Sequence, residues 1–271
     1  MTQEAEAILR AAGEILRRQT PVLDGREVES VVASMLERRG EFLRAREQHG
    51  SPLYLIDPHR LRQKAGEFVR AFQAELPDVH VYFAVKSNNH PAVARTLVEA
   101  GLGLDVSSGL ELQLALDCEA REVVFSGPGK TQGELRLAVA NRDRVAVLMD
   151  SFGELERLER AAAECGAAVR AGVRLTTDER GLWRKFGIPL GDLARFVAAA
   201  RGCRHVALRG LQFHTSWNLY PDSHVRFIRR LGGMLRELGA QNCSWIEFVD
   251  IGGGFWPPQG EWLLPAATPE G

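Results

Sequence analysis

Several residues with reactive or ligand-binding side chains directly follow apolar runs of the 271-residue chain. Lys86 follows "VHVYFAV", Asp105 follows "GLGL", and His214 follows "VALRGLQF". An amine in such a position can form an imine with an aldehyde, a nearby carboxylate can orient that amine, and an imidazole can stack on a ring. Each residue also has a plainer reading, because a strand-end lysine often marks where a strand meets water and a strand-end histidine is often structural.

A run of three glycines follows another apolar run, in "WIEFVDIGGGF". Gly252, Gly253 and Gly254 let backbone N–H groups approach a ligand closely and form an anion-binding nest, as expected for a phosphate. Simple chain flexibility is the alternative reading of these glycines. The segment "GPGKT" imitates the tail of a phosphate-binding P-loop, but Val124 stands where that motif requires glycine. A tight turn is enough to explain that segment.

Two further charged residues belong to the same set of strand ends. Glu111 lies near the start of the helix that follows Asp105, where a carboxylate often only compensates the helix dipole. Arg174 lies near the end of "AAVRAGVRL", ahead of the loop "WRKFGIP", and is equally compatible with a surface position. The role of both residues therefore depends on where the strands place them.

The elements that must position these residues are strands that alternate with helices. Strands are predicted at about 79–85, 102–106, 122–126, 144–149, 169–175, 206–213 and 246–250, and a helix is predicted near residues 58 to 75. The first strand is apolar on both faces, which suits a parallel strand covered by helices. Such alternation requires parallel strands joined by crossovers, so their carboxyl ends meet at one mouth. The fold class is therefore α/β, and the polar strand ends are predicted to converge on one cavity.

Seven strands are one short of a closed eight-stranded barrel. The closing segment "WPPQGEWLLPAATPEG" is rich in proline and glycine and contains no eighth strand, so we expect the barrel to be incomplete at its C-terminal end. The first fifty residues carry two apolar stripes at helical spacing, separated by "TPVLDG". The predicted domain division is a helical N-terminal extension at 1–50 and a barrel at 51–271.

Composition limits the partners of the chain. Its 34 basic and 35 acidic residues are well mixed, which argues against nucleic acid or an anionic membrane and favours a small-molecule ligand. The four cysteines form no C-x-x-C pair, so neither a zinc ribbon nor a disulfide framework is indicated, and no metal site is expected. No apolar run approaches a membrane span, and the acidic N-terminus does not resemble a signal peptide. We therefore expect a cytoplasmic protein with reduced thiols.

A lysine, a stacking histidine and a phosphate nest at one mouth suggest a phosphorylated aldehyde held as an imine, which is pyridoxal 5′-phosphate. The segments that carry these residues occur in a specific order: "YFAVKSN", "GLGLDVSSGLEL", "FSGPGKT", "RKFGI", "LQFHTS" and "DIGGGF". In this order and spacing they resemble the fold-type III pyridoxal-phosphate decarboxylases, the group that contains the diaminopimelate, ornithine and arginine decarboxylases. The resemblance covers roughly residues 51 to 256.

The resemblance implies a (β/α)8 TIM-type barrel of the alanine racemase-like kind and a role for each matching residue. Lys86 matches the imine-forming lysine, His214 the residue that stacks on the cofactor ring, and the three glycines the phosphate cup. Asp105, Glu111 and Arg174 match supporting polar positions, and Asp105 is placed to orient the lysine amine. The implied reaction is α-decarboxylation of a polar or basic amino acid, most like that of diaminopimelate decarboxylase.

The chain also departs from this family. Where the family commonly reads "HVGS" after the strand, this chain reads "HTSW", so Trp217 occupies the serine position and Ser216 is the candidate that replaces the serine one residue early. Family members continue into a last strand with a carboxylate for the pyridine nitrogen and a β-domain that completes the site across a homodimer. We therefore expect these 271 residues alone to bind the cofactor poorly and to show little decarboxylation, and a homodimer when the protein is complete.

Two other functions fit parts of the same pattern. An amino-acid racemase uses the same barrel and lysine, but "FSGPGK" together with "DIGGGF" favours the decarboxylases. A non-catalytic pyridoxal-phosphate-binding protein is a lone barrel of about this length, but such a barrel should possess its eighth strand.

Overall fold

The computed structural model describes residues 25–178, 184–215 and 221–255, which form two compact units. The smaller unit contains helix α2 (Gly25–Glu37) and helix α3 (Arg39–His49), so the second of the two apolar stripes predicted to be helical does lie in a helix. The larger unit runs from Leu55 to Gly254. The first predicted stripe, Ser216, Trp217 and the closing segment lie outside the described residues.

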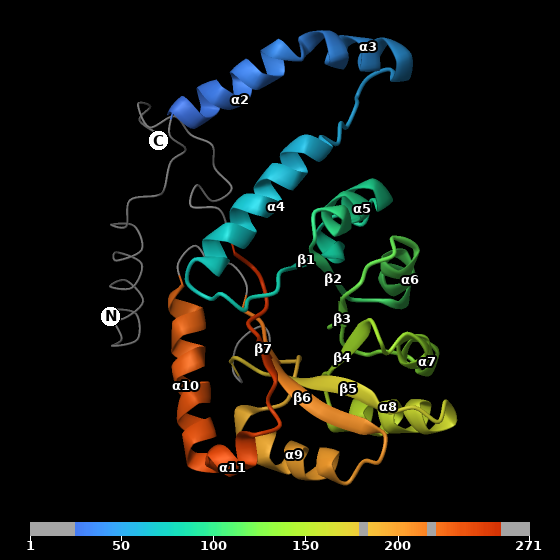
Figure 1. The fold of residues 1–271 in the computed structure, drawn as a ribbon, viewed down its shortest axis with the longest axis vertical. Helices are drawn as coiled ribbons and strands as arrows, with labels where there is room; N and C mark the ends of the chain where they lie inside the picture. Colours follow the sequence, from blue (N-terminus) through green and yellow to red (C-terminus); the bar gives the residue numbers. More distant parts are fainter. Residues whose placement is uncertain (1–24, 179–183, 216–220, 256–271) are drawn as a thin grey trace, which may run out of the picture. The chain divides into compact units, whose positions relative to one another are not determined.

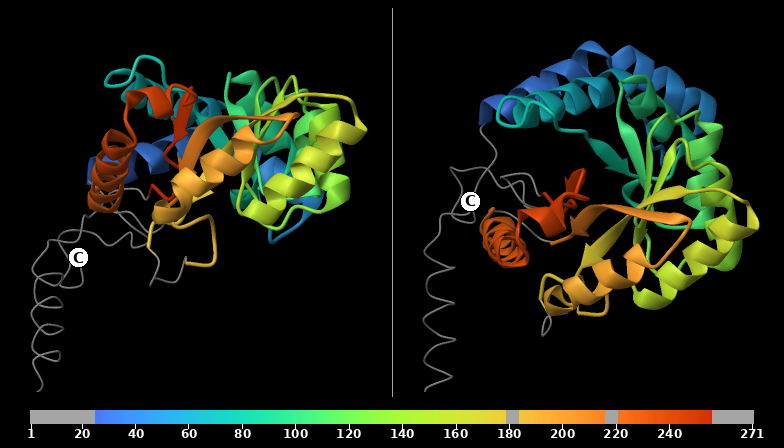
Figure 2. Two further views of the ribbon diagram at one scale, coloured as in Figure 1. Left: turned by 90° about the horizontal axis from the view of Figure 1, so that it is seen from below. Right: turned by 60° about the horizontal axis from the view of Figure 1, so that its bottom comes forward.

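The larger unit is built on one sheet of seven parallel strands that pair in the order of the sequence, from β1 to β7 (Figure 1). The strands are β1 (Tyr82–Ala84), β2 (Gly103–Val106), β3 (Val123–Phe125), β4 (Val145–Met149), β5 (Val169–Leu175), β6 (Val206–Phe213) and β7 (Phe248–Asp250). The sheet is curled, and helices cover its outer face (Figure 2). This arrangement confirms the predicted β/α barrel fold.

Helices alternate with the strands along the chain. They are α4 (Pro58–Gln73), α5 (Pro91–Glu99), α6 (Gly109–Asp117), α7 (Gln132–Ala140), α8 (Phe152–Glu164), α9 (Leu193–Arg201), α10 (Asp222–Leu238) and α11 (Ala240–Cys243), with short 3-10 turns η1 (Val85–Ser87) and η2 (Leu190–Asp192). The helix predicted near 58 to 75 is α4, and its N-terminus is fixed by Asp57, whose side chain accepts backbone N–H bonds, and by a proline at the first helical position.

Side-chain caps make three helices begin close behind the strands that precede them. Ser108 caps α6, Ser151 caps α8, and Thr131 forms a capping box with Glu134 at the start of α7. Glu134 also accepts a hydrogen bond from the Gly109 backbone N–H at 2.6 Å, so the N-termini of α6 and α7 are tied together. These contacts fix the short loops at the carboxyl ends of β2, β3 and β4.

The core lies between the sheet and its helices, where side chains such as Leu104, Phe125 and Phe196 are fully buried. On the inner face of the sheet, large aromatic side chains pack over glycines of the neighbouring strand. Gly103 and Gly210 have no side chain where Tyr82 and Phe248 lie, and any Cβ atom added at either glycine would collide with those rings. The inside of the curled sheet is therefore filled by large side chains seated over glycines.

The first and last strands are shorter than predicted. The sequence indicates a strand at 79–85, whereas β1 spans Tyr82–Ala84 and Val85 begins the 3-10 turn η1. Ser87 Oγ donates to the Ala84 carbonyl at 2.7 Å, which stabilises that turn. Each of β1 and β7 pairs with one strand within the described residues. Lys86 thus lies in a turn beyond the strand rather than directly behind it.

Candidate active site

The register of the sheet decides which strand-end side chains face inward. Phe248 and Gly210 are paired, and so are Gln212 and Asp250, which lie two residues further along β6 and β7. Paired and alternate residues share a face of a sheet. The inward face at the carboxyl ends therefore carries a set of polar residues: Asp105, Ser126, Asp150, Arg174, Gln212 and Asp250. Asp105 and Arg174, two of the residues predicted to converge, belong to this inward set.

Lys86 and Asp105 lie at the ends of neighbouring strands. Lys86 is exposed, whereas Asp105 is largely buried. Burial raises the pKa of the Asp105 carboxyl, and a hydrogen bond from Ser126 and the charge of Lys86 oppose that rise. Asp105 Oδ1 is buried without a hydrogen-bond partner among the described residues. This orphaned acceptor can receive a proton donor from a ligand or an amine.

Arg174 is an interior residue, which settles the alternative that the sequence left open. Its side chain is 12% exposed, and Nη1 lies 3.6 Å from Asp150 Oδ1. The Phe186 ring centre lies 4.6 Å from the guanidinium carbon, a cation–π contact. The loop that carries Phe186 is held by Ile188, whose backbone N–H donates to the Arg174 carbonyl at 2.9 Å. Arg174 is therefore a fixed positive charge at the mouth.

The three glycines lie beside His214, and two of their N–H groups already have acceptors. The Gly253 N–H donates to His214 Nδ1 at 3.1 Å, and the Gly252 N–H donates to Asp250 Oδ1 at 2.7 Å. Gly252 has a φ of +71°, and an added Cβ would lie 2.8 Å from His214 Cα, so glycine is required there. The phosphate cup at Gly252, Gly253 and Gly254 stays a prediction.

The same hydrogen bond defines the state of His214. Burial, together with the nearby charges of Lys86 and Arg174, lowers the pKa of His214 to about 4, so the imidazole is neutral at neutral pH. Because Nδ1 accepts from the Gly253 N–H, the ring proton resides on Nε2. His214 therefore presents an uncharged ring at the mouth, which suits packing against another aromatic ring.

Glu111 has a local partner. Its Oε2 accepts a hydrogen bond from the Ser107 backbone N–H at 2.7 Å, in the loop that follows β2. Its charge contributes to raising the pKa of Asp105, and its predicted role in binding the cofactor stays a prediction. This contact supports the simpler reading of Glu111 as a carboxylate that stabilises the start of α6.

Sequence reasoning missed several residues of the mouth. Asp150 ends "VAVLMD" in the same way that Asp105 ends its strand, so that signal was available. Asp250 was noted only as part of the glycine motif, yet burial and the nearby Asp105 carboxyl raise its pKa to about 6. Gln212 is buried, and its Oε1 has no hydrogen-bond partner among the described residues. No sequence signal distinguished Gln212 from an ordinary strand residue.

Lys130, which the sequence assigned to a tight turn, is buried. Its Nζ donates to the carbonyls of Gly127 and Leu148 at 2.6 and 2.7 Å and to Glu154 Oε1 at 2.6 Å. The three ammonium protons thus have three acceptors. This residue links the ends of β3 and β4 to the start of α8, and it has no free proton for a ligand.

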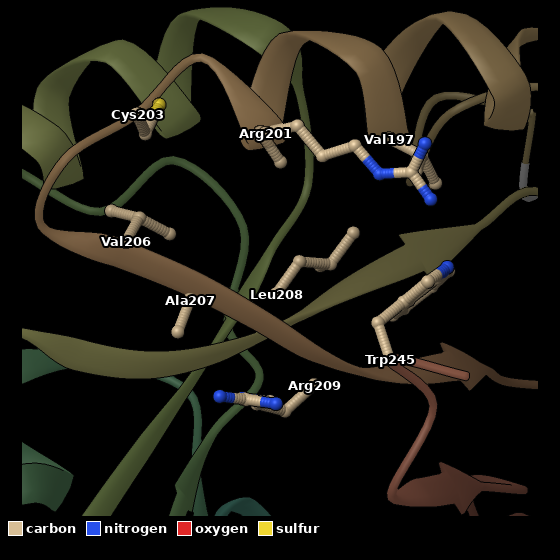
Figure 3. A pocket seen from close by; sticks show the side chains of 9 residues that line it. Val197, Arg201, Cys203, Val206, Ala207, Leu208, Arg209 and Trp245 are labelled. Atoms are coloured by element: carbon tan, nitrogen blue, oxygen red, sulfur yellow. The ribbon is translucent and has the colours of Figure 1, made fainter. Parts of the chain in front are cut away.

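Other kinds of site find little support in the described residues. No group of three or more His, Cys, Asp or Glu side chains there is arranged to hold a metal ion. No helix in that part of the chain is long and apolar enough to cross a membrane. A pocket of about 230 Å³ lies beside α9 and the amino-terminal half of β6, lined by residues including Arg209 and Trp245 (Figure 3). It is therefore at the opposite end of the strands from the mouth.

Comparisons with known proteins agree with this geometry. An L-glutamyl-[BtrI acyl-carrier protein] decarboxylase of Niallia circulans is 28% identical over 225 residues, 77% of this chain and 50% of that protein. A diaminopimelate decarboxylase of Mycobacterium tuberculosis is 30% identical over 227 residues, again 77% of this chain and 50% of that protein. The crystal structure of diaminopimelate decarboxylase from M. jannaschii superposes with a TM-score of 0.71 at 25% identity, over 78% of this chain and 53% of that one.

The chain thus spans about half the length of the relatives it matches. The family model described as "Pyridoxal-dependent decarboxylase, pyridoxal binding domain" matches residues 62–261, which is most of the chain. The chain therefore belongs to the pyridoxal-dependent decarboxylases and contains their pyridoxal-binding domain, whose cofactor is pyridoxal 5′-phosphate.

Proposed function

We propose that the complete protein removes the α-carboxyl group of an amino acid with a polar or basic side chain, and that Lys86 carries the cofactor. One observation supports this most strongly: Lys86, Asp105 and His214 lie at the carboxyl ends of one curled parallel sheet, and the charge of Lys86 acts on both of the other two side chains. The relatives named as decarboxylases of diaminopimelate and of an L-glutamyl carrier-protein conjugate support a polar substrate. The family match favours decarboxylation over the racemase alternative.

The residues present fit a flat, anionic aldehyde. An exposed amine at Lys86 is available for a carbonyl carbon, and the orphaned Asp105 Oδ1 is an acceptor for that amine. The neutral ring of His214 suits an aromatic face, and Arg174 supplies a fixed positive charge. Gly252 lets the backbone of His214 approach the glycine segment closely, because an added Cβ would lie 2.8 Å from His214 Cα. We assign Lys86, Asp105, Arg174, His214 and the glycine segment to the cofactor, and Ser216 remains a candidate outside the described residues.

When bound, pyridoxal 5′-phosphate supplies an electron-accepting ring for the charge left at the α-carbon. The protein's part is to hold groups in place. Asp105 lies on the strand beside Lys86 and would orient its amine, and the loop around Phe186 would keep Arg174 from moving toward solvent. His214 would remain neutral through the physiological pH range because its pKa is about 4. These roles require pre-organised side chains rather than groups that change charge during the reaction.

We further propose that the complete protein acts on a free small-molecule amino acid as a homodimer in the cytoplasm. The resemblance to the fold-type III decarboxylases supports the dimer, and the nearly equal numbers of basic and acidic residues support a small-molecule partner. Sedimentation of the complete protein would test the assembly: a strictly monomeric enzyme with full activity would contradict the dimer.

Borohydride reduction tests the assignment of Lys86. Protein loaded with pyridoxal 5′-phosphate is reduced, digested and mapped, and we expect the label on Lys86. Lys185 is the matched control, because it is an exposed lysine in a described loop outside the proposed anchor position. Label on Lys185 or Lys130 in place of Lys86 would overturn the assignment.

Carbon dioxide release tests the reaction itself. The complete protein is assayed with diaminopimelate, ornithine, lysine and arginine, beside a Lys86→Arg variant that keeps the charge but cannot form the same bond. We expect release from one or more of these amino acids and none from the variant. Cofactor label on Lys86 with racemisation and no release of carbon dioxide would favour the racemase reading instead.

A further inference from the structure

Two loops of the site extend beyond the last paired residues of their strands. Strands β6 and β7 are paired as far as Gln212 and Asp250. The chain continues from there to His214 on one side and to the glycine segment on the other, and β7 has a strand neighbour on only one side within the described residues. Strand hydrogen bonds therefore do not hold these two loops together, and other contacts must.

His224 of α10 lies between the two loops and contacts both. It is 5% exposed, and Thr215 Oγ1 lies 3.2 Å from its Nδ1 and 3.4 Å from its Nε2. It also makes a hydrogen bond to the backbone of Ile251. Because the contact with Ile251 favours the protonated ring, the acceptor there is the carbonyl, which can only receive a proton. One ring nitrogen then donates to Ile251, and the Thr215 hydroxyl can donate to the other.

Aromatic side chains also lie beside His224. Its ring centre lies 5.9 Å from that of Phe213, and the Phe213 ring in turn packs on Phe227 at 4.6 Å. An apolar side chain could pack against these rings as well as the imidazole does. Burying an imidazole costs free energy unless both of its nitrogens have hydrogen-bond partners. Thr215 supplies a hydroxyl where the family segment "HVGS" has valine. The threonine and the histidine therefore form a polar pair beside the Phe213 ring.

We propose that His224 is a positioning residue of the cofactor site. It holds Thr215, which adjoins His214, and Ile251, which adjoins Gly252, and it thereby fixes the hydrogen bond between the Gly253 N–H and His214 Nδ1. The inference rests on the proposed function, in which His214 and the glycine segment lie against the cofactor. His224 itself touches neither the cofactor nor the substrate in this assignment.

The test compares variants that remove the polar contacts of His224 with a control variant that keeps the hydroxyl group at position 215. Thr215→Val removes the hydroxyl without changing the outline of the side chain, and Thr215→Ser retains it as the matched control. His224→Phe fills the same apolar place without either polar contact. The complete protein is used throughout and carries ¹⁵N-labelled histidine. Thermal unfolding checks that each variant is folded.

The first readout needs no cofactor. Long-range ¹H–¹⁵N NMR reports which ring nitrogen of His214 carries the proton, and we expect a single Nε2–H form in the wild type and in Thr215→Ser. In Thr215→Val and His224→Phe we expect the two forms of His214 to mix. The second readout is the dissociation constant of pyridoxal 5′-phosphate, expected to rise about tenfold in those two variants and to stay within about twofold in Thr215→Ser. The double variant should be no worse than either single one, because both remove the same link.

Two results would overturn the inference. One is a Thr215→Val protein whose His214 spectrum and cofactor affinity equal those of the wild type. The other is loss of thermal stability in His224→Phe with the His214 spectrum and the affinity unchanged, which would make His224 merely structural. Failure of the proposed function is distinguishable: pyridoxal 5′-phosphate would then leave the wild-type His214 signals unshifted, whereas the cofactor-free spectra of the variants would still differ.

Discussion

Replacing Lys130 by methionine should destabilise the barrel unit strongly. The substitution keeps an unbranched side chain of similar length and removes the ammonium group, with its three hydrogen bonds to Gly127, Leu148 and Glu154. The Lys130 and Glu154 side chains are 0% and 1% exposed, so water cannot replace what is lost. The variant therefore leaves a carboxylate and two carbonyl groups buried without their donor.

The size of the effect follows from these contacts. Breaking a buried ion pair by removing one partner costs about 3–5 kcal/mol, so we expect the free energy of unfolding to fall by about 4 kcal/mol at pH 8. Burial raises the pKa of Glu154 and the charge of Lys130 opposes that rise, so the variant will have a still higher Glu154 pKa. The part of the penalty that comes from the ionised Glu154 carboxylate is absent below the ordinary Glu pKa and grows by about 1.4 kcal/mol per pH unit until the folded-state pKa is passed. The part that comes from the two carbonyl groups does not depend on pH.

Urea unfolding followed by circular dichroism at pH 5 and pH 8 provides the measurement. The loss in Lys130→Met should be smaller at pH 5, because Glu154 can then take up a proton. The double variant Lys130→Met with Glu154→Leu should recover more than half of the loss, since it removes the stranded charge. A loss below about 1 kcal/mol at pH 8, or a larger loss at pH 5 than at pH 8, would refute this account of the buried pair.

Two further predictions concern the end of β7 and the glycine segment that follows it. Gly252→Ala should weaken the binding of pyridoxal 5′-phosphate by about tenfold or more, because its φ is +71° and the new Cβ would meet the backbone of His214. Gly253→Ala, where nothing lies within 4 Å of the added Cβ, should stay close to the wild type in the same titration, and equal effects would contradict the argument. Asp250 has its pKa raised to about 6, so its ionised form costs stability increasingly as the pH rises through that value. Asp250→Asn should therefore gain about 1 kcal/mol relative to the wild type between pH 5 and pH 8 in urea unfolding, and a pH-independent difference would count against the raised pKa.

The order of the elements could be predicted from the sequence because each strand is an apolar run bounded by a polar end. The seven predicted strands correspond to β1–β7, and the alternation required parallel pairing. The limits of β1 could not be predicted, because the ladder that decides them depends on the neighbouring strand. The turn η1, which places Lys86 beyond the strand, is fixed by a Ser87 contact with the backbone rather than by apolar spacing.

Within the candidate site, the side chains that follow the strands could be foreseen and their surroundings could not. The sequence around Arg174 would look the same whether its side chain were exposed or buried. Only the structure shows that the Phe186 ring packs against its guanidinium group. Lys130 belongs to a turn motif, and its burial depends on Glu154, twenty-four residues further along the chain. His224 lies in the first turn of the amphipathic helix α10, where nothing in the local pattern indicates a contact with two loops.

The sequential strand order also bears on how the protein is made. Because each strand from β2 to β7 pairs with the strand before it, the sheet can grow in the order in which the ribosome delivers its parts. Synthesis at about 5–20 residues per second gives each unit of strand and helix time to dock before the next arrives. During that interval the newest strand has a bare edge that can pair with another nascent chain. Several strands, such as the three-residue β1 and β3, offer little edge for such pairing while the polypeptide is still being extended.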